Sequence, residues 1–315
     1  MVDSANQVRP KAGSGPQNGT FSYFKYNPEV HDYEKPFEIL INLPSIENDP
    51  ERFRRTNQQF EDRTTVVEDV RGREDQFTLD KQSVCWRKWE GPKDWAGLGA
   101  DAIQSKGHDW IRDGYIKDVE QFIKLTLESQ DGKPIDFVKV FDYKLRSSLD
   151  MENFHSRTLD LNNGLDRMIP VTHPHVDQSY KGAITRLEVH LPEDAERLRK
   201  TRFRIVNVWK PLTTATNWPL AICDSSTVRE EDLVTTDLVR RKYVGETFYS
   251  RFNPRHKWYY LSNQEPNEVT MLKIHDSSVD ARVRFCLHSS FKIEGVEDCG
   301  RESFEVRAFV FDKEE

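Results

Sequence analysis

The stretch RESFEVRAFVF (residues 301–311) changes between polar and apolar side chains at nearly every step. Positions 301, 303, 305 and 307 carry Arg, Ser, Glu and Arg, whereas 304, 306, 308 and 310 carry Phe, Val, Ala and Val. Because successive side chains of a strand point to opposite faces, this period of two predicts a β-strand with one polar and one apolar face. An apolar face must be covered, so the strand is expected to belong to a larger packed sheet.

The same period of two begins near residue 135 and continues to the end of the chain. Seven further stretches are predicted as strands: 135–145, 182–191, 202–210, 246–252, 256–262, 268–274 and 281–291. No crossover helix separates each successive pair, as a parallel sheet would require. The pattern therefore predicts an antiparallel sandwich or jelly roll, a mainly β fold with flanking helices.

Helical spacing is confined to a few places. Residues 109–129 form the best predicted helix, with Asp109 as its cap, and residues 192–200 form a second one. Residues 1–20 are rich in Gly, Ser, Pro, Asn and Gln and are expected to be a disordered tail. The remainder, 21–315, is expected to be one domain, with an N-terminal α/β elaboration over 21–134 and a jelly-roll core over 135–315.

Composition narrows the class of protein. The 315 residues are 36% hydrophobic and 11% aromatic, which is typical of a globular chain. The net charge of −7 and the lack of a long basic block disfavour a nucleic-acid partner. The four cysteines show no CxxC spacing, and no window approaches the apolar length of a membrane helix. With no apolar secretory region at the N-terminus, the chain is expected to be cytoplasmic and to have no membrane partner.

The segment HPHVDQS (173–179) places two histidines and an aspartate within five positions. Nine histidines, each with a 53/315 chance of an acid two places on, predict 9 × 53/315 ≈ 1.5 such pairs, so His175 and Asp177 alone carry no information. On a strand, however, residues two apart point the same way. Non-haem Fe(II) sites use two histidines and one carboxylate. His288, in the second-to-last predicted strand, is placed to supply the second histidine.

Arg301 and Ser303 open the last predicted strand and share its polar face. A guanidinium grips a carboxylate with two parallel charge-assisted bonds. The pair therefore suits the distal carboxylate of a co-substrate such as 2-oxoglutarate. Arg307 lies on the same face and is the alternative carboxylate clamp.

Several alternatives remain open at this point. His173 lies on the same strand face as His175 and is either a rival ligand or a pocket residue, and His275 competes with His288. Asn207, Trp209 and Lys210 are interpreted as pocket wall, although strand aromatics are more often core. The tryptophan-rich stretch 85–95 fits a lid and a packed loop equally well.

Taken together, these motifs resemble a known family. The chain is similar over most of residues 21–312 to the fungal hydroxylase/desaturase group related to the cephem methoxylase CmcJ and to gibberellin-desaturase-like proteins. The matching stretches are KPFEILINLP (35–44), VVEDVRGREDQFTLDKQSV (66–84), HVDQS (175–179), NVWKPL (207–212), NWPLAICDSSTV (217–228), EDLV (231–234), LHSSF (287–291) and RESFEVRAFVF (301–311).

The resemblance implies a double-stranded β-helix, of the jelly-roll, cupin-like type. It implies Fe(II) held by His175, Asp177 and His288, and 2-oxoglutarate held by Arg301. Two departures are Lys210, where arginine is expected, and the additional His173. The expected activity is Fe(II)/2-oxoglutarate-dependent hydroxylation, desaturation or oxidative ring formation on a small specialised metabolite, with O2 as the other substrate.

Other functions fit parts of the pattern. An Fe(II) oxidase of the same fold would use O2 without 2-oxoglutarate and hold a substrate carboxylate with Arg301. A non-catalytic jelly roll would bind a ligand only. A zinc hydrolase built on His173 and His175 is the weakest alternative, because no nearby general base is apparent.

Overall fold

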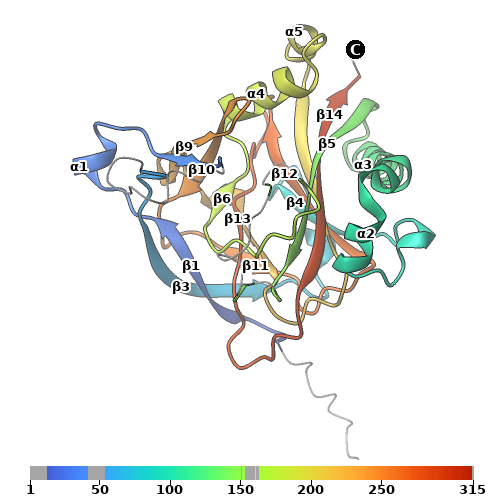
Figure 1. Cartoon of the computed structure of the whole chain (residues 1–315), viewed down its shortest axis with the longest axis horizontal. Helices are drawn as coiled ribbons and strands as arrows, with labels where there is room; N and C mark the ends of the chain where they lie inside the picture. The colour runs from blue at the N-terminus through green and yellow to red at the C-terminus, as the bar shows by residue number, and fades with distance from the viewer. Residues whose placement is uncertain (1–12, 42–53, 150, 153–159, 161–162, 314–315) are drawn as a thin grey trace, which may run out of the picture.

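The computed structural model describes residues 13–41, 54–149, 151–152, 160 and 163–313. Within them, strands form two sheets (Figure 1). The larger sheet runs in the order β1 (Gln17–Phe24), β3 (Phe60–Asp69), β11 (Trp258–Tyr260), β8 (Leu220–Cys223), β13 (His288–Ser290), β6 (His175–Val176), β10 (Val244–Ser250), β9 (Leu233–Val239) and β2 (Phe37–Ile39). The smaller sheet runs in the order β4 (Val84–Lys88), β12 (Glu268–Asp276), β7 (Phe203–Pro211), β14 (Glu302–Asp312) and β5 (Ile135–Ser147).

Most strand pairs are antiparallel, and only β11–β3 and β2–β9 are parallel within the described residues. The predicted jelly roll is therefore confirmed, and the curled sheets enclose a core between them. Strands predicted at 135–145, 202–210, 246–252, 256–262, 268–274 and 302–311 correspond to β5, β7, β10, β11, β12 and β14.

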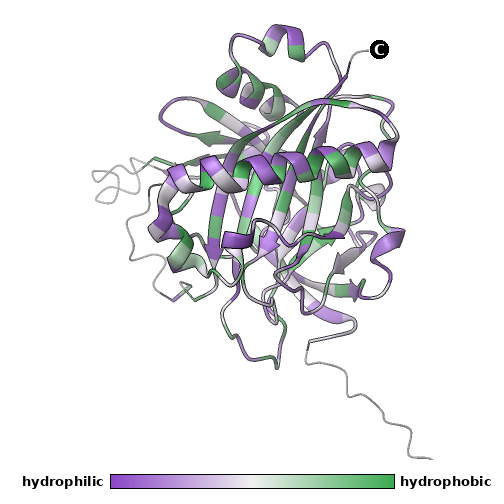
Figure 2. Ribbon diagram, turned by 90° about the vertical axis from the view of Figure 1, so that its right-hand side faces the viewer, coloured by the Kyte–Doolittle hydropathy of each residue, from purple (hydrophilic) through white to green (hydrophobic). Residues whose placement is uncertain are grey.

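Helices cover the outer face of the smaller sheet. α2 (Ala100–Trp110) is kinked at Gly107, and its last turn continues through a π-helical turn (Ile111–Tyr115) into the long helix α3 (Ile116–Asp131), which crosses the strands (Figure 2). The shorter helices are α1 (Pro28–His31), α4 (Tyr180–His190) and α5 (Ala195–Leu198), and 3-10 turns occur at Glu74–Gln76, Lys93–Trp95, Ser225–Thr227 and Glu230–Asp232. No helix within the described ranges is long and apolar enough to cross a membrane.

Strand β7 shows how the alternation of side chains divides the molecule. Ile205 and Trp209 belong to the core between the sheets, whereas Val206 and Val208 pack under the helices. By the same period of two, Asn207 faces the space between the sheets and Lys210 faces the helix side. This alternation decides which polar residues can reach the interior site.

The prediction of a strand at 182–191 is wrong, because the segment forms α4. The Ser179 hydroxyl accepts a hydrogen bond from the Gly182 N–H and caps the helix. Ala183 and Leu187, four residues apart, are its buried apolar residues, which is helical spacing. The strand predicted at 281–291 shortens to His288–Ser290.

The helix predicted at 109–129 is present, because Gly107 (φ 81°) breaks the helix that begins at Ala100 and a second helical stretch continues from there to Asp131. The Asp109 carboxylate pairs with Arg112 at 2.7 Å. The helix predicted at 192–200 is reduced to the single turn of α5. β1 to β4 were not predicted, and they place strands of the N-terminal elaboration in both sheets.

The predicted disordered tail is too long. β1 begins at Gln17, and the Tyr260 hydroxyl donates to the carbonyls of Gly13 (2.8 Å) and Gly15 (2.6 Å). The rest of the predicted tail, residues 1–12, lies outside the described residues. In the tryptophan-rich stretch 85–95, Val84–Lys88 is β4 and the Trp95 ring stacks on Tyr115 at 3.8 Å under the helices. The stretch is therefore packed structure rather than a lid.

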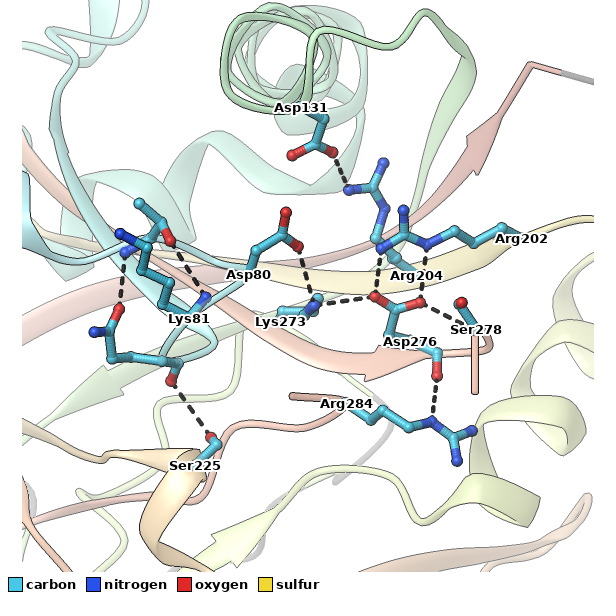
Figure 3. A network of polar contacts seen from close by, with 12 residues as sticks. Asp80, Lys81, Asp131, Arg202, Arg204, Ser225, Lys273, Asp276, Ser278 and Arg284 are labelled. Carbon is cyan, nitrogen blue, oxygen red and sulfur yellow. Dashed lines mark hydrogen bonds and ion pairs between the residues drawn. The ribbon is translucent and has the colours of Figure 1, made fainter. Parts of the chain in front are cut away.

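A network of buried ion pairs connects elements at one end of the smaller sheet (Figure 3). Arg204 on β7 is 1% exposed and pairs with Asp131 at the end of α3 and with Asp312 on β14, at 2.5 Å each. Asp276 on β12 accepts from Arg202 at 2.7 Å and from Lys273 at 3.0 Å. These pairs connect a helix and three strands without contributing to the histidine cluster.

Candidate metal centre

The predicted metal ligands come together in the middle of the larger sheet. His175 on β6 and His288 on β13 are direct partners in antiparallel register, so their side chains project from the same face. Asp177 follows β6 immediately, two residues after His175. The ligand atoms of the three side chains all lie within 4.8 Å of one another, and no other such group of His, Cys, Asp or Glu occurs in the part of the chain that the structure describes.

Backbone carbonyls fix the tautomer of both imidazoles. His175 Nδ1 lies 2.7 Å from the carbonyl of His173, and His288 Nδ1 lies 3.1 Å from the carbonyl of Cys286. A carbonyl oxygen can only accept, so each Nδ1 carries the proton and each neutral ring keeps its lone pair on Nε2. The geometry thus prepares two Nε2 ligands, with their outer nitrogens held as in metal-bound histidines.

The protonation states also suit a cation. Burial, followed by the nearby His175, lowers the pKa of His288 to about 3, so this ring is neutral at physiological pH. Burial alone would raise the pKa of Asp177, but the Arg307 guanidinium and the neighbouring histidines hold it well below its ordinary value. With the Nε2 of His175, the site therefore offers two imidazole nitrogens and one anionic oxygen, which is the donor set of a non-haem Fe(II) centre.

A small cavity of about 20 Å³ adjoins the cluster. His175, His288, Trp209, Arg146 and Arg301 are among the residues that line it. It is a half-enclosed space between the two sheets, with imidazoles on one side and guanidinium groups on another. This arrangement places a potential anion site next to a potential metal site.

Arg301 is the residue that tests whether 2-oxoglutarate fits. The side chain is 2% exposed, and its Nη1 donates to the Trp218 carbonyl and the Ser290 hydroxyl, both at 3.0 Å. Its Nε and Nη2, and the nearby Ser303 hydroxyl, are buried without a hydrogen-bond partner among the described residues. Burial lowers the pKa of Arg301 to about 9, which still leaves it charged at neutral pH. An unsatisfied buried guanidinium is costly, and a carboxylate would satisfy it.

The other predicted pocket residues divide into two groups. Trp209 lines the cavity, 5.7 Å below the Arg301 guanidinium, and Asn207 donates to Asp177 at 2.6 Å. Lys210 was predicted to line this pocket, and that prediction is wrong: it lies on the helix side of β7, where it donates to the Pro266 carbonyl. Two-residue alternation on the strand turns it away from the metal site.

The rival ligands do not reach the cluster. His173 stacks on Phe60 at 3.9 Å and contacts the Ser22 carbonyl, and His275 packs against Phe203 at 5.0 Å. Arg307, considered as the alternative carboxylate clamp, does not line the cavity but contacts Asp177 with two nitrogens. This geometry favours His288 over His275 and Arg301 over Arg307.

Sequence reasoning missed Arg146 and Glu305 as cavity residues and Asp142 as a partner of Arg307. A signal was present, because Asp142, Lys144 and Arg146 alternate along the predicted strand at 135–145 and its extension. In the sheet they lie opposite Arg307, Glu305 and Ser303 on β14.

Comparison with known proteins agrees with this geometry. A family model described as "Oxidoreductase/YMDC permease-like domain" matches residues 22–311. A hydroxylase/desaturase of Hormonema carpetanum is 32% identical over 81% of this chain and 86% of its own length, and one of Cercospora beticola is 33% identical over 80% and 78%. An Fe(II)/2-oxoglutarate-dependent dioxygenase of Aspergillus novofumigatus is 37% identical over 45% of this chain and 52% of its own.

The fold is shared with a solved structure. The iron- and alpha-ketoglutarate-dependent endoperoxidase NvfI superposes with a TM-score of 0.72 at 23% identity, covering 95% of this chain and 99% of its own. This similarity shows that the two chains share the jelly-roll architecture.

Proposed function

This chain belongs to the fungal hydroxylase/desaturase family, which includes Fe(II)/2-oxoglutarate-dependent dioxygenases, and we propose that it oxidises a C–H bond of a small specialised metabolite at the His175–Asp177–His288 centre. The outcome is hydroxylation, desaturation or oxidative ring formation. The cofactors are Fe(II) and 2-oxoglutarate, and O2 is the other substrate.

One observation carries the assignment of residues. Two of the three convergent ligands, His175 and His288, line the same cavity as Arg301, a buried guanidinium with two unsatisfied nitrogens. His175 and His288 would hold the metal through Nε2 and Asp177 through a carboxylate oxygen, while Arg301 with Ser303 would hold the distal carboxylate of 2-oxoglutarate. When bound, Fe(II) and 2-oxoglutarate would activate O2, which is the oxidant: one oxygen atom enters succinate as 2-oxoglutarate loses CO2, and the other drives the two-electron oxidation of the substrate.

The protein's own contribution is to orient the metal ligands and to form the cavity beside them. The carbonyl contacts of His175 and His288 keep the two rings in the metal-binding tautomer. Three protein ligands leave part of a metal's coordination sphere open to small molecules. The half-enclosed cavity lies between the two sheets, and Trp209, which stacks under Arg301, forms part of its wall.

We also infer that the enzyme works in a reducing compartment such as the cytoplasm, with a small-molecule substrate and without nucleic acid. All four cysteines are free thiols, and Cys85, Cys223 and Cys286 are buried. The net charge of −7 supports the absence of a nucleic-acid partner. Recovery of the native protein in the membrane or secreted fraction of its source cells would contradict this location.

The deciding experiment measures succinate. Purified protein loaded with Fe(II) is supplied with 2-oxoglutarate, O2 and candidate metabolites, and succinate is counted against oxidised product. The proposal predicts one succinate for each product and no product without 2-oxoglutarate. Product formed without succinate would identify an oxidase that uses Arg301 for the substrate's own carboxylate.

The matched control is the Asp177→Ala variant. It should bind Fe(II) far more weakly than the parent while remaining folded. A folded Asp177→Ala protein that binds Fe(II) as tightly as the parent would instead support a binding protein without this catalytic centre.

A further inference from the structure

The two oxygens of Asp177 are not equivalent. Oδ2 accepts from Asn207 Nδ2 at 2.6 Å and from Arg307 Nε at 2.9 Å. Among the residues that the structure describes, Oδ1 accepts only from Arg307 Nη2, at 3.1 Å, and it lies 3.7 Å from His175 Nε2. A carboxylate oxygen has two acceptor positions. Both positions of Oδ2 are therefore filled by protein donors, and one position of Oδ1 is left on the side of the histidines.

The donors are themselves held in place. Arg307 is 7% exposed, its Nη1 donates to Asp142 at 2.9 Å, and its Nη2 lies 3.6 Å from Glu305. The Asn207 amide donates its second hydrogen to Glu305 at 2.7 Å. In the smaller sheet, Asp142, Arg307 and Asn207 stand side by side in register on β5, β14 and β7. A rigid row of the smaller sheet thus reaches across the interior to a residue of the larger sheet.

We propose that Arg307 and Asn207 act as positioning residues that restrict Asp177 to binding the metal through Oδ1 alone. This inference rests on the proposed function, since it assumes that Asp177 is a ligand. Arginine is suited to the task because its planar fork contacts both oxygens at once and stays charged. A ligand that donates one atom keeps one more coordination position open for 2-oxoglutarate, O2 or water than a ligand that donates two.

The first test uses Arg307→Lys and measures Mn(II) affinity by titration of the metal-free protein. Lysine keeps the charge but has no planar fork, so it cannot hold both oxygens. Loss of a partner that orients a metal ligand typically weakens metal binding about 10- to 100-fold. We expect a loss in this range, larger than the loss in the control.

The control is Arg204→Lys. Arg204 on β7 is also buried and bridges two carboxylates, Asp131 at the end of α3 and Asp312 on β14, away from the cluster. Its substitution should lower the thermal stability of the metal-free protein much as Arg307→Lys does. Its Mn(II) affinity should stay within about twofold of the parent. Equal losses of affinity in both variants would overturn the inference.

The second test uses Asn207→Leu and does not depend on Arg307. Leucine frees one acceptor position of Oδ2, so that Asp177 can bind through both oxygens. Mn(II) prefers six ligands, so three protein atoms leave about three waters and four leave about two. Water-proton relaxation by bound Mn(II) should then fall by about one third. The control Thr270→Val, which also replaces a buried polar side chain on the smaller sheet, should relax water like the parent.

The outcomes separate the two claims. If Asp177→Ala binds Mn(II) like the parent, the proposed metal centre is wrong and the inference fails with it. If Asp177→Ala loses the metal but Arg307→Lys and Asn207→Leu match the parent in affinity and in water relaxation, only the role of the positioning residues is wrong. If Arg307→Lys does not fold, the relaxation of Asn207→Leu alone decides, and a value equal to the parent's contradicts the inference.

Discussion

Two arginines on one face of β14 have different surroundings, although their sequence context is similar. The period of two could predict that Arg301 and Arg307 share a face, and the position of Arg301 beside Ser303 favoured it as the carboxylate clamp. The alternation of Asp142, Lys144 and Arg146 signalled a polar strand face, but sequence could not fix the register that pairs Arg307 with Asp142, because the two residues are 165 positions apart and the register shifts just after Arg307. The pairing register of distant strands, rather than the residue type, places Arg307 against Asp177.

At this scale, Arg301→Lys should weaken 2-oxoglutarate binding. A lysine cannot make two parallel bonds to a carboxylate, and losing a buried charge-assisted contact costs about 2 kcal/mol or more, roughly 30-fold in Kd. Calorimetric titration of the Mn(II)-loaded protein with 2-oxoglutarate measures the change. Ser303→Ala, which removes one neutral hydroxyl, should lose only about fivefold. An unchanged Kd in Arg301→Lys would show that another group holds the co-substrate.

Among the elements, α4 shows where a period-of-two interpretation fails. Residues 182–191 contain apolar side chains at spacings that fit a strand and a helix, and Ile184 and Val189 remain 39% and 43% exposed. Whether this segment forms a strand or a helix depends on tertiary contacts that the order of polar and apolar residues does not reveal. Ser179 caps the helix, and its hydroxyl also donates to Glu246 on β10. β14 was predicted correctly because polar and apolar residues alternate over 303–308, and its apolar residues Phe304, Val306 and Ala308 pack in the core under the helices.

Gly182 lets α4 lie against β10. A Cβ at this position would stand 2.1 Å from the Glu246 carbonyl oxygen, a backbone atom that cannot move away cheaply. Gly182→Ala should therefore destabilise the protein by about 1–3 kcal/mol, as overpacking does. Thermal unfolding measures this as a lower Tm. Gly114→Ala is the matched control, because a Cβ there meets nothing within 4 Å. Equal Tm values for the two variants would contradict the close packing of α4.

At the scale of the whole molecule, the N-terminal elaboration is part of both sheets. β1 and β3 extend the larger sheet beside β11, and β4 pairs with β12 at the edge of the smaller one. We therefore propose that residues 21–315 fold as one cooperative unit. Sequence predicted most strands of the second half, although not β6, β8 and β9, but it did not predict β1, β3 and β4. The partners of β3 and β4 in the second half lie within residues 258–272.

If the whole domain folds cooperatively, a fragment that lacks the N-terminal strands should not fold by itself. Residues 135–315 expressed alone should lack a stable fold, because removing β1, β3 and β4 uncovers sheet edges and core. Circular dichroism and denaturant unfolding of the fragment, compared with the full chain, provide the measurement. A fragment that unfolds with a sharp transition of its own would divide the chain into two domains.

The ionic network predicts how stability depends on pH. Burial alone would raise the pKa of Asp276, but the bonds from Arg202 and Lys273 lower it to about 2 from an ordinary 3.8. A lowered pKa contributes stability above the unfolded value, and that stability is lost as the pH falls from about 4 towards 2. The contribution is roughly 2 kcal/mol at neutral pH.

Asp276→Asn should consequently be less stable than the parent at pH 7, and the difference should shrink as the pH falls below about 4. Urea unfolding at pH 7, 4 and 3 follows the difference. Asp237→Asn, which removes a half-exposed carboxylate on β9, is the control and should change stability little at any of these pH values. A difference for Asp276→Asn that stays constant down to pH 3 would show that its charge is not what stabilises the network.

The most direct measurement is anomalous X-ray diffraction at the iron edge from crystals grown anaerobically with Fe(II). We predict one strong peak about 2 Å from His175 Nε2, His288 Nε2 and Asp177 Oδ1. An iron peak at any other group of side chains, or none at this cluster in crystals of iron-loaded protein, would contradict the assignment of the metal centre.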